Sequence, residues 1–477
     1  MQRSDENWTL ALDQGGHASR ALVFSADGRE VARAEAPVST QCPRTGWVEH
    51  DPAAVRASIS TCIRLIAEAL GADVRRIGAA ALATQRSSLV CWSRSDGTAL
   101  SPVLSWQDTR GAALLDELAL DPAEIHAITG LRISPHYGAS KLRWCLGELP
   151  AVGMAATRGD LAVGPLATWL VFALSDGHCF AADPCNASRT LLWDVRTRDW
   201  SPRLLAVFGV PPEILPRCQA NRADWTTLSL GDHRVPLVVV TGDQSAVPYA
   251  FPTPDAGDAF LTLGTGAFLQ QVEGATPTRC AGLLNSVIWQ DGDTIQYALE
   301  GTVNGAGAAL AWLAETEKIA EAELFAALPA WLESAVEPPV FINAIGGLAA
   351  PFWKSHARSE FVGVSNLAGR AVAVVESIAF LVRANLDRMR EDGRPVRRLT
   401  VVGGLARLDG LLERIASLAC VPVYRAEHAE ATAYGSARLA SKFLPPLGTD
   451  TRFEPNAAFG AALEPRYRRC LEKWRAP

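Results

Sequence analysis

The sequence has no apolar run long enough to span a lipid bilayer. Its longest such run, Leu161 to Leu174, falls short of the roughly 20 residues that a membrane helix needs, and it predicts a core helix instead. The stretch from Met1 to Thr9 is polar and contains no apolar signal region. We therefore expect a soluble, cytoplasmic protein with no membrane partner.

Neither sign of charge dominates, because 45 Lys and Arg face 51 Asp and Glu for a net charge of −6. This balance argues against general nucleic-acid binding. The ten cysteines lack the short paired spacing of zinc and redox motifs, which indicates buried or incidental thiols in a reducing compartment. A chain of 477 residues with 48% hydrophobic and 20% charged residues predicts a globular protein of two or three domains.

One stretch, residues 236–268, combines two strand ends with polar groups. Leu237 to Val240 is a mostly β-branched run that predicts a buried strand, and Asp243 follows it closely. Open α/β sheets bind ligands at the carboxyl ends of their strands. A second predicted strand, 260–263, ends in Gly264-Thr265-Gly266, whose backbone amides and hydroxyl suit a phosphate group. A carboxylate and a phosphate cradle this close in sequence indicate phosphoryl transfer.

Each of these features also has a plainer interpretation. Gly-Thr-Gly after a strand is often an ordinary turn, and an aspartate at a strand end often only caps a helix. The N-terminus, however, repeats the pattern, because the apolar run Thr9 to Leu12 leads into Asp13-Gln14-Gly15-Gly16 and strands resume at Ala21 and Val31. We interpret this as a weak internal duplication of a phosphate-binding hairpin. Two such hairpins, one in each half, would hold the phosphates of one nucleotide from opposite sides.

In the first half, strands and helices alternate, which predicts a mostly parallel sheet covered by helices. Asp51-Pro52 predicts a helix N-terminus, and Ile77 to Ala83 predicts a strand. Asp183 to Arg189 is interpreted as a polar loop, and residues 245–257 as the hinge between the halves.

In the second half, helices are predicted for Gly301 to Trp312 and for Val372 to Arg390. Leu399 to Val402 predicts a strand that ends in Gly403-Gly404, with another helix starting at Asp409. This arrangement suits an adenosine group held by close backbone approach, although a plain tight turn is the better interpretation of this feature taken alone. The basic run from Arg466 to Arg475 is interpreted as a solvated helix face.

Taken in order, six short motifs resemble those of the FGGY carbohydrate kinases, and within them the glycerol kinases. The resemblance covers roughly residues 9–440 and rests on the order and spacing of the motifs, none of which decides the matter alone. The motifs are Gly46-Trp47-Val48-Glu49-His50-Asp51-Pro52, Trp106-Gln107-Asp108-Thr109-Arg110, Asn186-Ala187-Ser188-Arg189-Thr190, Gly242-Asp243-Gln244, Gly264-Thr265-Gly266 and Ala298-Leu299-Glu300-Gly301.

The resemblance implies an α/β protein with a two-lobed fold of the actin and hexokinase type (ribonuclease H-like) and a ligand cleft between the lobes. Residues 1–250 would form an N-terminal lobe that binds the alcohol or sugar and carries the first phosphate loop. Residues 251–445 would form a nucleotide-binding lobe, and residues 446–477 a C-terminal tail. The implied reaction transfers the γ-phosphoryl group of ATP, with Mg²⁺, to a hydroxyl of a small polyol or sugar. A homodimer is allowed for, and no nucleic-acid partner is expected.

The resemblance also assigns roles to single residues. Asp243 matches the catalytic base, and Asp13 lies where the family approaches magnesium and phosphates, so both are candidate metal ligands. The candidate acceptor-binding residues are Arg86, Ser87, Trp106, His136, Asp243, Gln244 and Phe268. The candidate nucleotide-binding residues are Asp13, Gly15, Gly16, Gly264, Thr265, Gly266, Gly403, Gly404 and Asp409.

Four positions depart from the glycerol kinase pattern. Ser87 replaces a glutamate and His136 a tyrosine on the acceptor side, while Gly16 replaces a threonine and Val402 an aspartate on the nucleotide side. Ser87 is shorter and neutral, and a histidine can be positively charged near neutral pH. We therefore expect a roomier, more positive pocket for an acceptor longer than glycerol, including one whose carboxylate pairs with Arg86. The alternative is that another acidic residue replaces the glutamate and glycerol still fits.

Two other classes of function stay open at this point. One is a catalytically weak relative that binds a metabolite and acts as a regulator, which Gly16 and Val402 favour and the retained Asp13 and Asp243 disfavour. The other is a nucleotide-switched binding module, which has no reason to keep Trp106 together with an arginine. A kinase that phosphorylates a polyol or sugar, with glycerol as the first candidate, is the leading interpretation.

Overall fold

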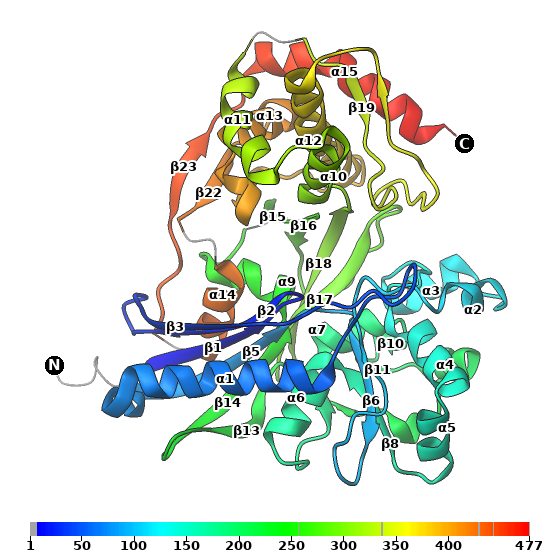
Figure 1. Cartoon of the computed structure of the whole chain (residues 1–477), viewed down its shortest axis with the longest axis vertical. Coiled ribbons are helices and arrows are strands. Elements are labelled where there is room, and N and C mark those ends of the chain that lie inside the picture. The colour runs from blue at the N-terminus through cyan, green and yellow to red at the C-terminus, as the bar shows by residue number, and fades with distance from the viewer. Residues whose placement is uncertain (1–6, 256, 335–336, 428–429, 442, 477) are drawn as a thin grey trace.

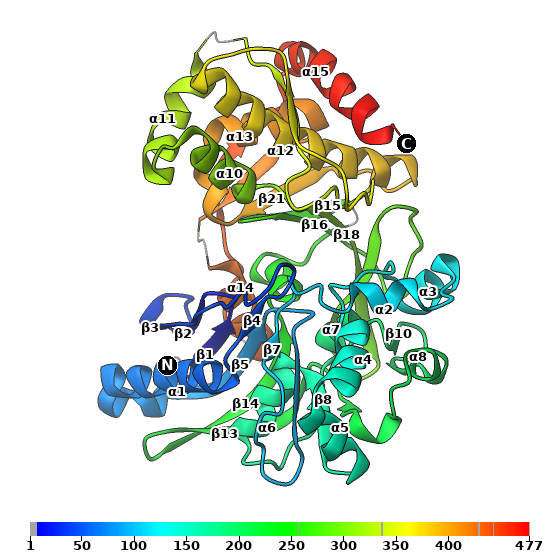
Figure 2. The same cartoon turned by 45° about the vertical axis from the view of Figure 1, so that its right-hand side comes forward.

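The computed structural model describes residues 7–255, 257–334, 337–427, 430–441 and 443–476, so most of the polar N-terminal stretch lies outside the described residues. Two lobes lie one above the other in Figure 1, and Figure 2 shows the same division from a second side. Each lobe is built on one large mixed β-sheet with helices packed on it. The expected two-lobed α/β architecture is confirmed.

The sheet of the first lobe has the strand order β13-β14-β5-β1-β2-β3. Its strands are β1 (Trp8–Gln14), β2 (Ala18–Phe24), β3 (Glu30–Pro37), β5 (Ile77–Thr84), β13 (Arg222–Leu230) and β14 (His233–Gly242). The predicted N-terminal meander is confirmed by the antiparallel pairing of β1 with β2 and of β2 with β3. The prediction of a mostly parallel sheet is wrong, because β13 also pairs antiparallel with β14, which makes three of the five neighbouring pairs of this sheet antiparallel. β5 runs parallel to both β1 and β14. The carboxyl ends of these three parallel strands therefore meet at one edge of the sheet.

The sheet of the second lobe has the order β17-β18-β16-β15-β21-β22-β23. Its strands are β15 (Asp258–Leu263), β16 (Ala267–Val272), β17 (Leu284–Asp291), β18 (Thr294–Val303), β21 (Arg398–Val402), β22 (Val423–Ala426) and β23 (Thr449–Phe453). β15 pairs antiparallel with β16 and parallel with β21, as β1 does with β2 and β5. The two predicted hairpins thus hold equivalent places in the two sheets.

Shorter strands complete the lobes. They are β4 (Glu49–His50), β6 (Leu89–Ser93), β7 (Val103–Leu104), β8 (Leu161–Pro165), β9 (Ala181–Ala182), β10 (Trp193–Asp194), β11 (Asp199–Trp200), β12 (Arg217–Cys218), β19 (Val340–Ile342) and β20 (Glu360–Val362). β4, β7, β6 and β8 form a second sheet in the first lobe.

Helices cover the sheets. The α-helices are α1 (Pro52–Leu70), α2 (Ala112–Asp116), α3 (Pro122–Thr129), α4 (Gly138–Glu148), α5 (Pro150–Thr157), α6 (Leu166–Leu174), α7 (Pro184–Ala187), α8 (Pro202–Phe208), α9 (Asp243–Ala246), α10 (Gly307–Glu317), α11 (Glu321–Glu333), α12 (Leu367–Glu391), α13 (Asp409–Ala419), α14 (Ala431–Ala440) and α15 (Ala457–Arg475). The 3₁₀ turns are η1 (Gly71–Arg76), η2 (Ser188–Thr190), η3 (Pro212–Ile214), η4 (Val247–Ala250) and η5 (Gly404–Arg407). Within the described ranges, no helix combines the length and apolar character that crossing a membrane requires.

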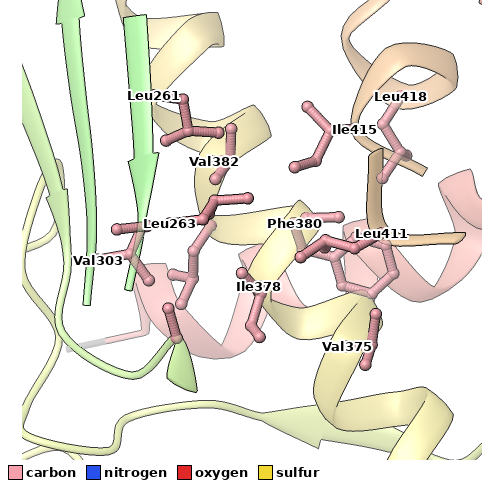
Figure 3. Packing of buried hydrophobic residues seen from close by; sticks show 14 of the residues in the cluster. Leu261, Leu263, Val303, Val375, Ile378, Phe380, Val382, Leu411, Ile415 and Leu418 are labelled. Atoms are coloured by element: carbon pink, nitrogen blue, oxygen red, sulfur yellow. The ribbon is translucent and has the colours of Figure 1, made fainter. Parts of the chain in front are cut away.

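The core of the second lobe is organised around α12. Figure 3 shows side chains of this helix between the sheet and α13, with Leu261 and Leu263 on one side and Leu411 on the other. The predicted apolar face of α12 is confirmed, because Val375, Ile378, Ala379 and Val382 are all buried. Burying one large aliphatic side chain contributes about 1.5–3 kcal/mol. This packing gives β15 and β21, whose ends carry the candidate nucleotide loops, a rigid support.

The chain crosses between the lobes more than once. α14 lies beside β1 and β5 of the first lobe (Figure 1), and its Ala433 and Tyr434 share an apolar cluster with Leu22 and Phe24. A Cβ on Gly435 would lie 2.0 Å from the carbonyl oxygen of Ala246, so glycine alone permits this approach. α14 thereby anchors the short helix that begins at Asp243.

Four local predictions are wrong. The run Leu161 to Leu174 forms β8, which ends at Pro165, followed by α6, because proline is disfavoured in the interior of a helix. Residues 183–189, predicted as a polar loop, form buried turns of α7 and η2, with Asp183 as the helix cap. Gly301 belongs to β18, and the helix predicted there starts only at Gly307. Residues 446–477, predicted as a tail, form β23 of the second sheet and α15, which is packed on the core of this lobe.

Candidate active site

Three of the predicted site residues lie at the carboxyl ends of the parallel strands β1, β5 and β14. Asp13 pairs in register with Ala83 of β5, which places Arg86 just beyond the same edge. Asp243 directly follows Gly242, the last residue of β14. A Cβ on Gly242 would lie 2.6 Å from the aliphatic stem of Arg86, so this glycine lets the arginine cross over the strand end. The sheet therefore brings together Asp13, Arg86 and Asp243.

Arg86 makes a buried ion pair with a residue of the other lobe. Its Nη1 donates to Oε1 of Glu300, on β18, over 2.6 Å, and only 6% and 5% of the two side chains are exposed. Nη1 of Arg189 donates to the other carboxylate oxygen of Glu300 over 2.8 Å. Burial alone would raise the pKa of Glu300, but the charges of Arg86 and Arg189 outweigh it and lower this pKa to about 2.

This ion pair corrects the expectation about the charge of the acceptor pocket. Arg86 is not left without a carboxylate when Ser87 replaces the glutamate, because Glu300 is its partner. His136 does not supply the expected positive charge either, since burial and the neighbouring Lys141 lower its pKa below 6.5. Glu300 is thus an acidic residue beside Arg86, as in the alternative stated above, but it belongs to one of the six motifs, and whether glycerol fits stays a prediction. The expectation of extra room at the shorter Ser87 is unaffected.

Asp243 lies within reach of the same arginine. Its Oδ1 is 3.9 Å from Nε of Arg86 and accepts a hydrogen bond of 2.7 Å from the backbone amide of Gln244. Burial raises the pKa of Asp243, while the charge of Arg86 partly opposes this rise. Burial raises the pKa of Asp13 to about 7, and the negative charge of Asp243 adds to the rise. The charge of Asp243 therefore acts on the carboxyl group of Asp13.

Two aromatic residues from opposite lobes face each other at this site. The rings of Trp106 and Phe268 meet edge to face with their centroids 6.3 Å apart. Nδ1 of His136 donates to the carbonyl oxygen of Trp106 over 3.1 Å, and the backbone amide of Trp106 donates to Oγ of Ser88 over 3.0 Å. These contacts place the predicted acceptor residues around one apolar wall.

The two candidate phosphate loops are the turns of the two hairpins. The amide of Gly264 donates to the carbonyl oxygen of Gly266 over 2.9 Å, and the first amides of α10 donate to carbonyl oxygens of the same loop. Thr265 is exposed, and its hydroxyl has no hydrogen-bond partner among the described residues. Gly403 has φ = 97°, and a Cβ there would lie 2.4 Å from the carbonyl oxygen of Leu263. Glycine is thus required where β21 passes the end of β15.

Two other candidate nucleotide-binding residues, Gly16 and Asp409, lie in less restrictive surroundings than Gly403. A Cβ on Gly16 would meet no atom within 4 Å, so no local contact demands a glycine there. Asp409 begins α13, where its carboxylate is mostly exposed and pairs with Arg425 of β22. The structure therefore gives Asp409 a partner on its own lobe.

Sequence reasoning missed three residues that help to build this site. Glu300 and Arg189 lie inside two of the motifs that carried the resemblance, but no role was assigned to either. Lys141 was missed entirely, although a lysine between the apolar residues Ala139 and Leu142 is a usable signal. Its side chain is fully buried, and burial lowers its pKa to about 7.

Comparison with known families decides the class of protein. The family model for the N-terminal domain of the FGGY family of carbohydrate kinases matches residues 8–247. The model for the C-terminal domain of the same family matches residues 259–443. The chain belongs to the FGGY family of carbohydrate kinases. The resemblance seen in the six motifs is confirmed, and this FGGY kinase is an ATP-dependent phosphotransferase that acts on an alcohol group.

Individual relatives extend the match over the whole chain. A glycerol kinase of Aromatoleum aromaticum is 35% identical, covering 98% of this chain and 97% of that relative. A glycerol kinase of Alkalilimnicola ehrlichii is 36% identical, covering 96% and 94%. The family match favours catalysis over the regulator and the binding module considered above.

Solved structures show the same fold. The glycerol kinase of Plasmodium falciparum, solved with ADP, superposes with a TM-score of 0.88 at 24% identity over 99% of both chains. A gluconate kinase of Lactobacillus acidophilus superposes with a TM-score of 0.84 at 18% identity, covering 98% of this chain and 97% of that one. The FGGY kinase therefore has the two-lobed, actin-like fold expected of its family.

Proposed function

We propose that this FGGY kinase transfers the γ-phosphoryl group of ATP to a hydroxyl of a small, neutral polyol, with glycerol as the first candidate. The ion pair between Arg86 and Glu300 carries this proposal, because the carboxylates of Glu300 and Asp243 already oppose the charges of Arg86 and Arg189 when the acceptor arrives. Arg86 then offers its remaining N–H groups to hydroxyl oxygens rather than a free charge to a carboxylate. The full-length similarity to glycerol kinases supports a polyol.

Asp243 is the proposed general base. Its position beside Arg86 at the end of β14 suits a group that accepts the proton of the reacting hydroxyl. In a loose phosphoryl-transfer transition state this proton leaves late, so a weak but well-placed carboxylate is sufficient. Trp106 and Phe268 would contact the carbon chain of the acceptor and exclude water from one side of it.

The carboxylates of Asp13 and Asp243 fit a magnesium ion in kind and number. Mg²⁺ is commonly held by one or two carboxylates together with substrate phosphates and water. Burial is the main cause of the raised pKa of Asp13, and the negative charge of Asp243 adds to it. A divalent cation beside these carboxylates would favour their charged forms. Bound there, the ion would neutralise charge on the transferred phosphate. The described residues contain no group of three or more His, Cys, Asp and Glu side chains that could hold a metal by itself.

The two glycine loops are the proposed phosphate-binding elements. Gly15 and Gly16 follow β1, and Gly264 to Gly266 follow β15, so each lobe presents one loop from an equivalent hairpin. The exposed Thr265 hydroxyl and the loop amides would donate to phosphate oxygens. Gly403 and Gly404, at the end of β21, would hold the adenosine group. Asp409 is left out of the proposed nucleotide site, because its carboxylate pairs with Arg425.

The test is to measure ADP release from magnesium-ATP with glycerol, four- and five-carbon polyols, ketopentoses and aldonic acids. A neutral polyol should exceed every aldonic acid in kcat/KM by at least about tenfold, which corresponds to about 1.4 kcal/mol. The Asp243→Asn variant serves as the inactive control. An aldonic acid as the best acceptor would contradict the proposed neutral pocket, and no ADP release above this control with any acceptor would contradict the proposed function.

A further inference from the structure

Lys141 is a fully buried lysine whose ammonium group is surrounded by backbone carbonyls. Its Nζ donates to the carbonyl oxygens of Ser105 over 2.6 Å, His136 over 2.7 Å and Ser87 over 3.1 Å. An ammonium group has three N–H donors and no acceptor, so these three carbonyls match its full hydrogen-bonding capacity. Its side chain is 0% exposed, so it has no surface role.

The three carbonyls belong to three separate segments of the candidate acceptor pocket. Ser87 directly follows Arg86, Ser105 directly precedes Trp106, and His136 is itself a pocket residue that bonds to the carbonyl of Trp106. Lys141 lies on α4, behind these segments. One side chain therefore links the segments of the pocket's arginine, tryptophan and histidine, and its three hydrogen bonds go to backbone carbonyls, not to the carboxylates of Asp13 or Asp243.

The Ser87 segment needs such a link, because its backbone is strained. Ser87 has φ = 64°, in the left-handed region that a non-glycine residue adopts at a cost of roughly 1–2 kcal/mol. Such conformations persist only where the surroundings hold them. Here the hold comes from the bond of Lys141 to the Ser87 carbonyl and from the bond of the Trp106 amide to Oγ of Ser88.

The charge of Lys141 is costly where it lies. It is in the first turn of α4, where the helix dipole is positive, and both burial and Arg110 disfavour the charged form, with Asp108 opposing them. Burial also lowers the pKa of the neighbouring His136, and the thiol of Cys145 lies on the same helix. A methionine or leucine would fill this space without that cost. The three carbonyl bonds are thus the physical reason for a lysine at this place.

We infer that Lys141 is a positioning residue for the acceptor site, which fixes Arg86, Trp106 and His136 relative to one another through their backbone. It touches neither the acceptor nor the nucleotide. Its loss therefore weakens acceptor binding and leaves nucleotide binding intact. This inference rests on the proposed function for the identity of the acceptor, but the contacts themselves do not depend on it.

The test compares Lys141→Met, which keeps the length and loses the donors, with the wild type. The kcat/KM for the best acceptor should fall about 10- to 100-fold, mainly through KM, since small displacements of binding groups have effects of this size. The dissociation constant of ADP, measured by calorimetry, should change by no more than about twofold, because distant sites are nearly independent. Lys473→Met is the matched control, since the side chain of Lys473, on α15, is 57% exposed and pairs with Glu360 on the surface.

Hydrogen exchange gives a readout that does not depend on activity. Amides of residues 85–89 and 103–109 should exchange faster in Lys141→Met, while the loop 264–266 in the other lobe should not change. A wild type that releases no ADP with any acceptor would contradict the proposed function, yet this exchange comparison would still test Lys141. Lys141→Gln, which retains two donors, should show a smaller effect in both measurements.

Three outcomes would overturn the inference. The first is that Lys141→Met leaves both the acceptor KM and the exchange of residues 85–89 and 103–109 unchanged. The second is that ADP binding weakens as much as acceptor binding. The third is that both Lys141→Met and Lys141→Gln fail to fold, which would make Lys141 a purely structural residue.

Discussion

The guanidinium of Arg86 and the carboxylate of Glu300 meet across the two lobes at 2.6 Å, although 214 residues separate them in the chain. Arg189 binds the second oxygen of the same carboxylate. This contact joins the two lobes beside Asp243. The stability of the folded protein therefore depends on whether Glu300 is ionised.

The first prediction concerns the ionisation of Glu300. Its pKa is lowered from 4.5 to about 2 in the folded protein, so its contribution is present above pH 4.5 and is lost as the pH falls toward 2. A shift of this size corresponds to roughly 3 kcal/mol of stability. Urea unfolding between pH 7 and pH 2 should show this loss in the wild type. Glu300→Gln should be destabilised at pH 7 and lack this part of the pH dependence, whereas Glu360→Gln, on the surface, should behave as the wild type.

The second prediction concerns Asp243 as the general base. Asp243→Asn should lower kcat by roughly two to four orders of magnitude, because the reacting hydroxyl loses its proton acceptor. The affinity for the acceptor should change much less, since Arg86, Trp106 and Phe268 remain. Steady-state kinetics with calorimetric binding of the acceptor separate the two effects, and Asp409→Asn is the control. Near-normal turnover of Asp243→Asn would remove this residue from the chemical step.

The third prediction concerns the missing hydroxyl in the first phosphate loop. Gly16→Thr should fold normally, because no atom lies within 4 Å of the added Cβ and φ is not in the left-handed region. The new hydroxyl should tighten binding of a non-hydrolysable ATP analogue by about 1.5–3 kcal/mol, the value of a hydrogen bond to a charged group. Gly403→Ala is the contrasting variant, since its Cβ would lie 2.4 Å from a backbone oxygen at a positive φ. Weaker analogue binding by a folded Gly16→Thr would show that this loop does not approach the phosphates.

The fourth prediction concerns the room beside Ser87. Ser87→Glu should shift preference toward glycerol and away from longer acceptors, because the larger side chain fills the space and accepts hydrogen bonds from hydroxyls. The measurement is the ratio of kcat/KM for glycerol to that for a five-carbon polyol. Ser87→Gln has the same size without the charge, so it separates the effect of volume from that of charge. An unchanged ratio in both variants would show that Ser87 does not face the acceptor.

The sequence by itself determined the elements that depend on neighbouring residues. The strands ending at Asp13 and Asp243, the two glycine hairpins and the helix cap at Asp51 were all predictable, because strand propensity, turn chemistry and capping act over a few residues. The same local reasoning failed at residues 161–174, where apolar content alone does not distinguish a strand from a helix. Long buried runs carry no periodicity, so Pro165 was the better signal.

Only the tertiary structure decided the charge and the shape of the acceptor pocket. The partner of Arg86 is Glu300 on a strand of the other lobe, and the residue that links the pocket's backbone is Lys141 on a helix behind it. Neither contact follows from spacing, because the chain folds back over long distances and pairing inside a protein depends on which groups lose water together. A missing glutamate at position 87 therefore predicted an excess of positive charge that the folded protein does not have.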